Sequence, residues 1–125
     1  MGYDITLYVV EKTNSMNDGK YYAQEIARFD MCVFPELARF MADEPPTDCY
    51  FYADDGNTHV VEDRYGAPLT ETEVSEMIYF LEDVVKNTYW TVYRRIPPVL
   101  AALKAIKEQI DEGVWKNVVV LRYGS

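Results

Sequence analysis

The sequence is poor in the residues that most often carry chemistry. It holds a single histidine, His59, and only two cysteines, Cys32 and Cys49, which stand 17 positions apart. Neither cysteine has a Cys-x-x-Cys or Cys-x-x-His spacing, so the pattern argues against a zinc site. A Cys–His catalytic pair needs a base within hydrogen-bond reach and often a third orienting group, and nothing in the spacing provides them.

Whole motifs are missing as well. The chain has no Gly-x-Ser-x-Gly, no Gly-x-x-x-x-Gly-Lys-Ser/Thr and no Gly-x-Gly-x-x-Gly, the signatures of serine hydrolases, P-loops and dinucleotide-binding folds. No apolar run approaches the roughly 18 residues that a helix needs to span a bilayer. The first ten residues contain Asp4 and no Lys or Arg, unlike a secretory signal. We therefore expect a cytoplasmic protein with reduced thiols.

Basic residues are nearly absent from the middle of the chain. Between Asp43 and Asp83 one base, Arg64, stands against 12 acids, a net charge of −11. The rest of the chain holds 11 basic and 9 acidic residues, and the whole chain carries −9. A field of this size and sign favours a basic partner and disfavours direct binding to nucleic acid or to an anionic membrane.

The hydrophobic pattern predicts one α+β domain over residues 1–125. At 49% hydrophobic and 14% aromatic, the chain has ample material for a core. We expect a small antiparallel or mixed sheet of about four to five strands packed against two to three helices. The predicted strands are 3–12, 20–33, 49–53, 58–63 and 115–123, and the predicted helices are 36–42, 70–86 and 97–112, the first with Pro35 at its start. Residues 3–12 are apolar on both faces, which is typical of a central strand. Residues 20–33 also fit one face of a helix, but we favour a strand that pairs back onto 3–12.

The helix over 70–86 has the clearest signals. Thr70 and Glu73 have the spacing of a capping box at its start. Residues 88–95 are ambiguous, because their aromatic residues favour a strand whereas no Gly or Pro separates them from the helix. We favour a helix that continues to Arg94-Arg95, whose charges suit a helix C-terminus. A last helix then opens at Pro97-Pro98 and is capped by Gly113.

Acidic side chains crowd the predicted hairpin between the third and fourth strands. Asp54-Asp55-Gly56-Asn57 supplies its turn, but it lacks the alternating acids of a calcium loop. The adjacent acids Glu62 and Asp63 point to opposite faces of a strand and cannot share a substrate. We therefore expect neither a metal nor a cofactor, and read these acids as solvated or facing a partner.

The helix over 70–86 presents a second acidic surface. Glu73, Glu76 and Asp83 fall on one side of it, with Phe80 among them, spaced roughly 5 to 10 Å apart. Phosphates of duplex DNA have comparable spacings. An acidic helix beside an acidic hairpin would therefore imitate a nucleic-acid backbone and fit the basic groove of a protein that binds nucleic acid.

In size and charge the chain resembles small acidic antagonists carried by phages and mobile elements, including DNA-mimic inhibitors of restriction and CRISPR effectors. Our leading hypothesis is accordingly a cytoplasmic interaction protein that binds and blocks a basic surface of a nucleic-acid-processing protein or effector complex. Charges set rate and register, whereas desolvated aromatic anchors add affinity. The expected partner-binding residues are Asp54, Asp55, Glu62, Asp63, Glu73, Glu76, Asp83, Tyr50, Tyr52, Tyr65 and Phe80.

Two other functions remain open. One is a small-molecule-binding domain or an enzyme with an aromatic pocket near His59 and Arg94, although we favour a protein without catalytic activity and assign no catalytic residue. The other is an oligomeric structural protein that associates through tyrosine-rich strand edges, which leaves a homodimer open.

Overall fold

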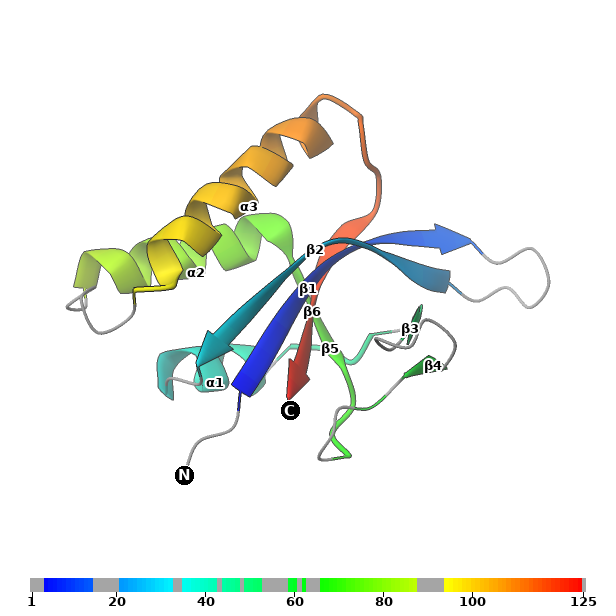
Figure 1. Ribbon diagram of the computed structural model, residues 1–125, viewed down its shortest axis with the longest axis horizontal. Helices are drawn as coiled ribbons and strands as arrows, with labels where there is room; N and C mark the ends of the chain where they lie inside the picture. Colours follow the sequence, from blue (N-terminus) through cyan, green and yellow to red (C-terminus); the bar gives the residue numbers. More distant parts are fainter. Residues whose placement is uncertain are drawn as a thin grey trace.

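The strands form one mixed sheet of six in the order β4-β3-β2-β1-β6-β5 (Figure 1). A computed structural model describes residues 4–14, 21–32, 35–42, 44–47, 49–52, 59–60, 62, 66–87 and 94–124. Only β2 and β3 run parallel, and the other neighbours are antiparallel. The strands are β1 (Asp4–Asn14), β2 (Tyr21–Cys32), β3 (Cys49–Tyr52), β4 (His59–Val60), β5 (Thr70–Glu73) and β6 (Val118–Gly124).

Strand β1 lies between β2 and β6, and its sequence explains why. Ile5, Leu7 and Val9 point to one face, Tyr8 and Val10 to the other, and all five are buried. A strand that is apolar on both faces is stable only with cover on both sides. The prediction of a central first strand, with the second strand pairing back onto it, is therefore confirmed.

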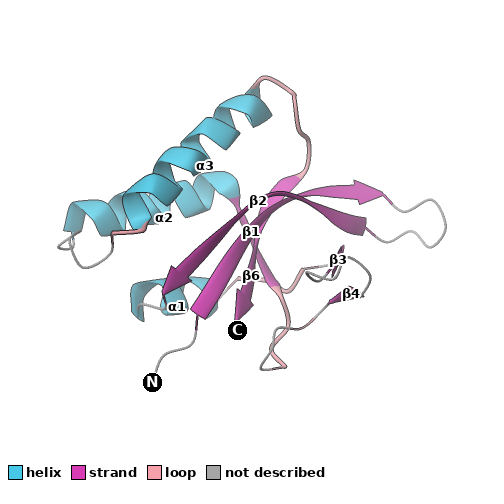
Figure 2. Ribbon diagram, viewed as in Figure 1, coloured by secondary structure: helices cyan, strands magenta, loops and turns pink. Residues whose placement is uncertain are grey.

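Three helices cover the face that carries Leu7: α1 (Pro35–Ala42), α2 (Val74–Asn87) and α3 (Ile96–Asp111). Figure 2 shows the helices gathered on one side of the strands. Leu37 of α1, Leu81 of α2 and Leu103 of α3 are fully buried in this core. Each such side chain contributes about 1.5–3 kcal/mol by leaving water. The α+β class is confirmed. The described residues contain three helices, as predicted, and six strands, one more than predicted.

That additional strand is β5, and here the predicted capping box is wrong. Thr70 to Glu73 pairs antiparallel with β6, and the helix begins at Val74. The Thr70 hydroxyl is buried and has no hydrogen-bond partner among the described residues, so it does not cap the helix. The residues Thr-Glu-Thr-Glu also alternate with the period of a strand. Pairing with β6 provides hydrogen bonds for more of their backbone N–H and C=O groups than a helix cap would.

The two predicted helix ends, at Arg94-Arg95 and at Gly113, had different outcomes. Helix α2 ends at Asn87, and Arg94 and Arg95 form a turn that opens α3, so they do not close a longer helix. The interpretation of residues 88–93 lies outside the described residues. The Gly113 cap is confirmed: with φ of 84°, its N–H donates to the Ile110 carbonyl and Val114 N–H to that of Gln109. This is the Schellman arrangement that glycine favours.

Described residues between α1 and β5 pack against the second face of the sheet. Thr47 N–H donates to the Leu69 carbonyl at 2.7 Å, and Glu71 N–H donates to that of Pro45 at 3.0 Å. The same stretch continues into β3, which pairs with β2. Cys49 and Leu69 therefore pack with the central strands in a second, smaller core.

Candidate protein-interaction surface

The outward side of α2 carries the acidic residues that the sequence singled out. Val74, Met77 and Leu81 point into the core, so the opposite side of the helix faces solvent. Glu76 and Asp83 are exposed on that side, two turns or about 10 Å apart. Glu73, the last residue of β5, is exposed just before the helix. The structure thus places Glu76 and Asp83 on one side of α2, whereas Glu73 lies on β5 and lines a separate cavity with Lys12 and Lys107.

These acids are available to a partner. Glu73, Glu76 and Asp83 have no ion pair among the residues that the structure describes. Asp83 accepts a hydrogen bond of 2.8 Å from Asn87 Nδ2, which leaves its charge uncompensated. Glu82, by contrast, lies 3.4 Å from Lys104 Nζ on α3, on the side of α2 that meets its neighbour. The uncompensated charge therefore lies along one side of α2.

Glu71 has a different role from the one its position in the sequence indicates. Predicted in the first turns of the helix, it lies on β5, and its Oε1 is 2.9 Å from Lys12 Nζ. Its Oε2 accepts a hydrogen bond of 2.9 Å from the Thr47 hydroxyl. Both charged side chains are largely buried, so this pair connects β1 to β5 and contributes little to the external field.

Phe80 takes part in an aromatic cluster that links two helices. Its ring stacks on that of Phe40 from α1, with centroids 4.3 Å apart and planes 7° from parallel. Beside them Tyr79 is 80% exposed, the most exposed of the large apolar side chains described. Phe40, Tyr79 and Phe80 line a shallow hollow with Ser75 and Glu76, of about 650 Å³ and mostly apolar. We call these five residues the aromatic hollow.

Sequence reasoning identified only Phe80 and Glu76 of the aromatic hollow. Phe40 was missed because it is 40 positions from Phe80, and only the packing of α1 on α2 brings their rings together. Tyr79 had a usable signal. It follows Glu76 by three residues and precedes Asp83 by four, which places it on the acidic side of the helix.

The remaining predicted residues are elsewhere or undescribed. Glu62 is exposed in an isolated bridge to Pro68. Only the backbone of Tyr50 and Tyr52 is described, on β3. The predictions for Asp54, Asp55, Asp63 and Tyr65 lie outside the described residues.

The predicted juxtaposition of hairpin and helix is not formed by the described residues. The two strands β3 and β4 join the sheet at the Tyr21 end of β2, whereas α2 lies toward the other end of the molecule (Figure 1). The acidic helix and the hairpin strands are therefore separate surfaces. The sequence pattern indicates each element but not where the elements lie relative to one another.

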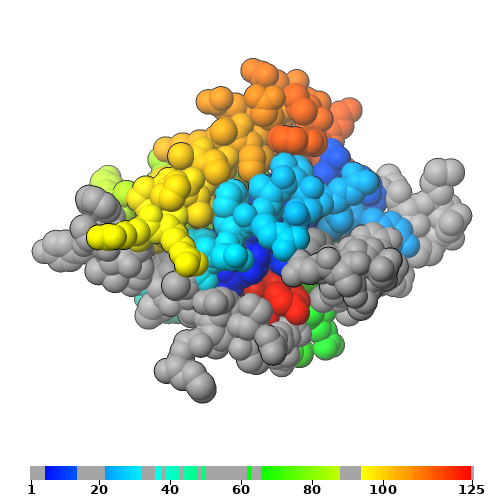
Figure 3. Space-filling model, viewed as in Figure 1, coloured from blue at the N-terminus to red at the C-terminus, as the bar shows by residue number. Residues whose placement is uncertain are grey.

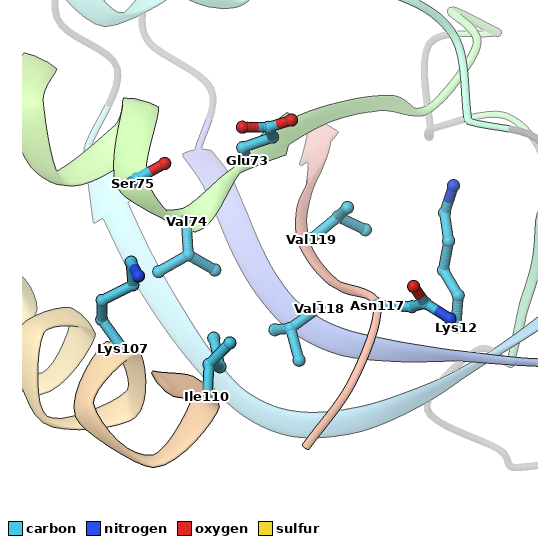
Figure 4. A pocket seen from close by; sticks show the side chains of 9 residues that line it. All are labelled: Lys12, Glu73, Val74, Ser75, Lys107, Ile110, Asn117, Val118 and Val119. Atoms are coloured by element: carbon cyan, nitrogen blue, oxygen red, sulfur yellow. The ribbon is translucent and has the colours of Figure 1, made fainter. Parts of the chain in front are cut away.

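A separate cavity of about 480 Å³ lies where β5 turns into α2 (Figure 4). Val74, Val118 and Ile110 form an apolar part of its lining, and charged side chains stand at its margin. Lys107 pairs with Asp111 there. The lining contains no aromatic side chain, so this is not the predicted aromatic pocket. No group of His, Cys, Asp and Glu among the described residues is arranged to hold a metal ion.

Among the described residues no pocket joins His59 to Arg94, because these two residues lie at different ends of β2. His59 is on β4, which joins β2 through β3 at the Ala23 end. Arg94 directly precedes Arg95, whose Nη1 donates to the Asp30 carbonyl at 3.1 Å. About 23 Å of extended strand separates Ala23 from Asp30.

The two cysteines are likewise too far apart to form a disulfide with each other. Cys49 is a buried thiol opposite Tyr21, at one end of β2, and Cys32 is the last residue of that strand. The intervening strand is about 36 Å long, whereas a disulfide needs Cα atoms within about 7 Å. The cross-strand partner of His59 is Tyr52, so His59 and Cys49 do not face each other across this pair of strands.

The oligomer hypothesis requires an open strand edge. The described residues contain one along β2, but it is not rich in tyrosine. Strand β3 pairs only with Tyr21–Ala23, so residues 24–32 of β2 have no strand neighbour on that side among the described residues. Figure 3 shows β2, in light blue, at the surface in the centre of this face. A register shift of β2 against β1 at Val9/Val10 and the charges of Glu25 and Arg28 blunt this edge.

Comparison of the chain with protein-family models, with curated proteins and with solved structures finds no match. Among the described residues no helix has the length and apolarity required to cross a membrane. The outward side of α2 and the aromatic hollow beside it are the best-defined surfaces of the described residues.

Proposed function

We propose that this chain is a small acidic interaction protein that binds and blocks a basic surface of a nucleic-acid-processing protein. The observation that supports this most is the outward side of α2. There Glu76 and Asp83 are exposed and have no ion-pair partner among the described residues, on a helix whose other side is fixed in the core. A rigid row of like charges keeps its spacing when a partner approaches, so less ordering entropy is lost on binding.

The amount and the spacing of the negative charge indicate the class of partner that this chain would bind. The net charge of −9 attracts a basic protein over a range set by the Debye length, about 8 Å at physiological salt. Glu76 and Asp83 are about 10 Å apart, close to the length of three phosphate-to-phosphate steps along the axis of one DNA strand. A groove lined with Lys and Arg for nucleic acid would accept such a row, and the bound protein would then exclude the natural ligand.

The proposal is tested by capture and competition. The immobilised protein is exposed to a cell lysate at about 50 mM and about 500 mM salt, and retained proteins are identified. We expect a basic nucleic-acid-binding protein that is retained at low salt, released at high salt and displaced by duplex DNA. Retention that neither salt nor DNA affects, or retention of nothing at either salt, would contradict the proposal.

A further inference from the structure

The aromatic hollow is unusual in being exposed. Aromatic side chains normally gain by burial, yet Tyr79 is 80% exposed, and the Phe40–Phe80 stack beside it is only partly buried. The hollow joins α1 to α2, two helices held by the same core, so its shape is fixed by the fold. An exposed and preformed aromatic surface of this kind often marks a contact site.

The margin of the aromatic hollow is acidic. Glu76 belongs to its lining, and Asp83 is one turn beyond Tyr79 on the same side of α2. Neither acid has an ion-pair partner among the described residues. Aromatic faces and carboxylates in one place complement a group that is both cationic and able to stack.

We propose that the aromatic hollow is a subsite for an arginine side chain of the basic partner. This inference rests on the proposed function and names the chemistry of its contact. A guanidinium group is planar and weakly hydrated, so it stacks on the exposed Tyr79 ring and directs its N–H donors to the Glu76 carboxylate. A lysine ammonium is compact and strongly hydrated, and gains less from the rings.

Charge also decides against the other occupants of such a surface. A nucleic-acid base would stack on Tyr79, but its phosphates would meet Glu76 and Asp83. A second copy of this chain, docked through the same hollow, would bring two sets of these acids together without a compensating cation.

The test compares two peptides of equal charge, tetra-arginine and tetra-lysine, both with blocked termini. Binding is measured by calorimetry at low salt and mapped by NMR. We expect the arginine peptide to bind about fivefold more tightly, and to shift the ring resonances of Tyr79. Tyr79→Ser should remove most of that preference. Because this side chain is exposed, the variant should unfold at the same denaturant concentration as the parent.

Matched controls separate the site from the overall field. Glu76→Gln and Glu112→Gln change the net charge equally, but Glu112 is the C-cap of α3 and does not line the aromatic hollow. We expect Glu76→Gln to weaken arginine-peptide binding about fivefold more than Glu112→Gln. Val114→Ser, at the other strongly exposed apolar side chain, should have no effect.

Two results would overturn the arginine subsite. If both peptides bind equally and Glu76→Gln matches Glu112→Gln, the subsite is wrong, while a basic partner remains supported. If neither peptide binds, the subsite is wrong and the proposed function loses its support as well.

Discussion

Reversing Glu73, Glu76 and Asp83 to Lys should weaken partner binding by about 100-fold at low salt, or roughly 2.7 kcal/mol. The three substitutions change the net charge from −9 to −3. Two of them lie on the side of α2 that we assign to the partner, and Glu73 directly precedes the helix. Like charges would then meet across the interface, which mainly lowers the association rate. Surface plasmon resonance against the captured partner, at several salt concentrations, measures this loss.

The matched control makes the same charge change on another helix. Glu108, Asp111 and Glu112 lie at the C-terminal end of α3, where lysine suits the helix dipole. Reversing them to Lys should weaken binding by less than tenfold. If both triple variants lose affinity equally, only the net charge matters and α2 has no special role. The corresponding Gln and Asn substitutions in α2 test the same point if the lysine variant does not fold.

Replacing Leu81 with Ala should lower the free energy of unfolding by about 3 kcal/mol. Leu81 is fully buried in the core where α2 meets the sheet and the other helices. Its truncation removes apolar contacts and leaves a cavity that rigid neighbours fill only in part. Because a domain of this size has a stability of about 5–15 kcal/mol, the loss is a large fraction. Chemical denaturation monitored by circular dichroism measures it.

The adjacent residue provides the control for Leu81. Glu82→Ala removes an exposed side chain and its pair with Lys104, and such surface pairs contribute about 0–1 kcal/mol. Its effect on the free energy of unfolding should therefore be several times smaller. Equal losses in the two variants would contradict the assignment of inner and outer sides to α2.

Much of the fold follows from periodicity along the sequence. Apolar residues on both faces predicted the central position of β1, and Pro35 and Gly113 marked a helix start and a helix end correctly. The failure at Thr70 and Glu73 is instructive, because their spacing fits a capping box and their alternation fits a strand equally well. Only pairing with β6, 48 positions away in the case of Thr72, decides between them.

The candidate surface was predictable only in part, for a similar reason. The acids of α2 share one side of a single helix, so their spacing places them together. The aromatic hollow needs α1 beside α2, and the separation of the β3–β4 hairpin from α2 follows from strand order. Periodicity within one element carries no information about either placement.

The most direct test of a binding role for α2 is hydrogen exchange of the chain with and without the captured basic protein. We predict slower exchange over residues 74–87 in the complex than in the free chain. This difference should shrink as the salt concentration is raised. Unchanged exchange over 74–87, with protection confined to β2 or to α3, would contradict the account.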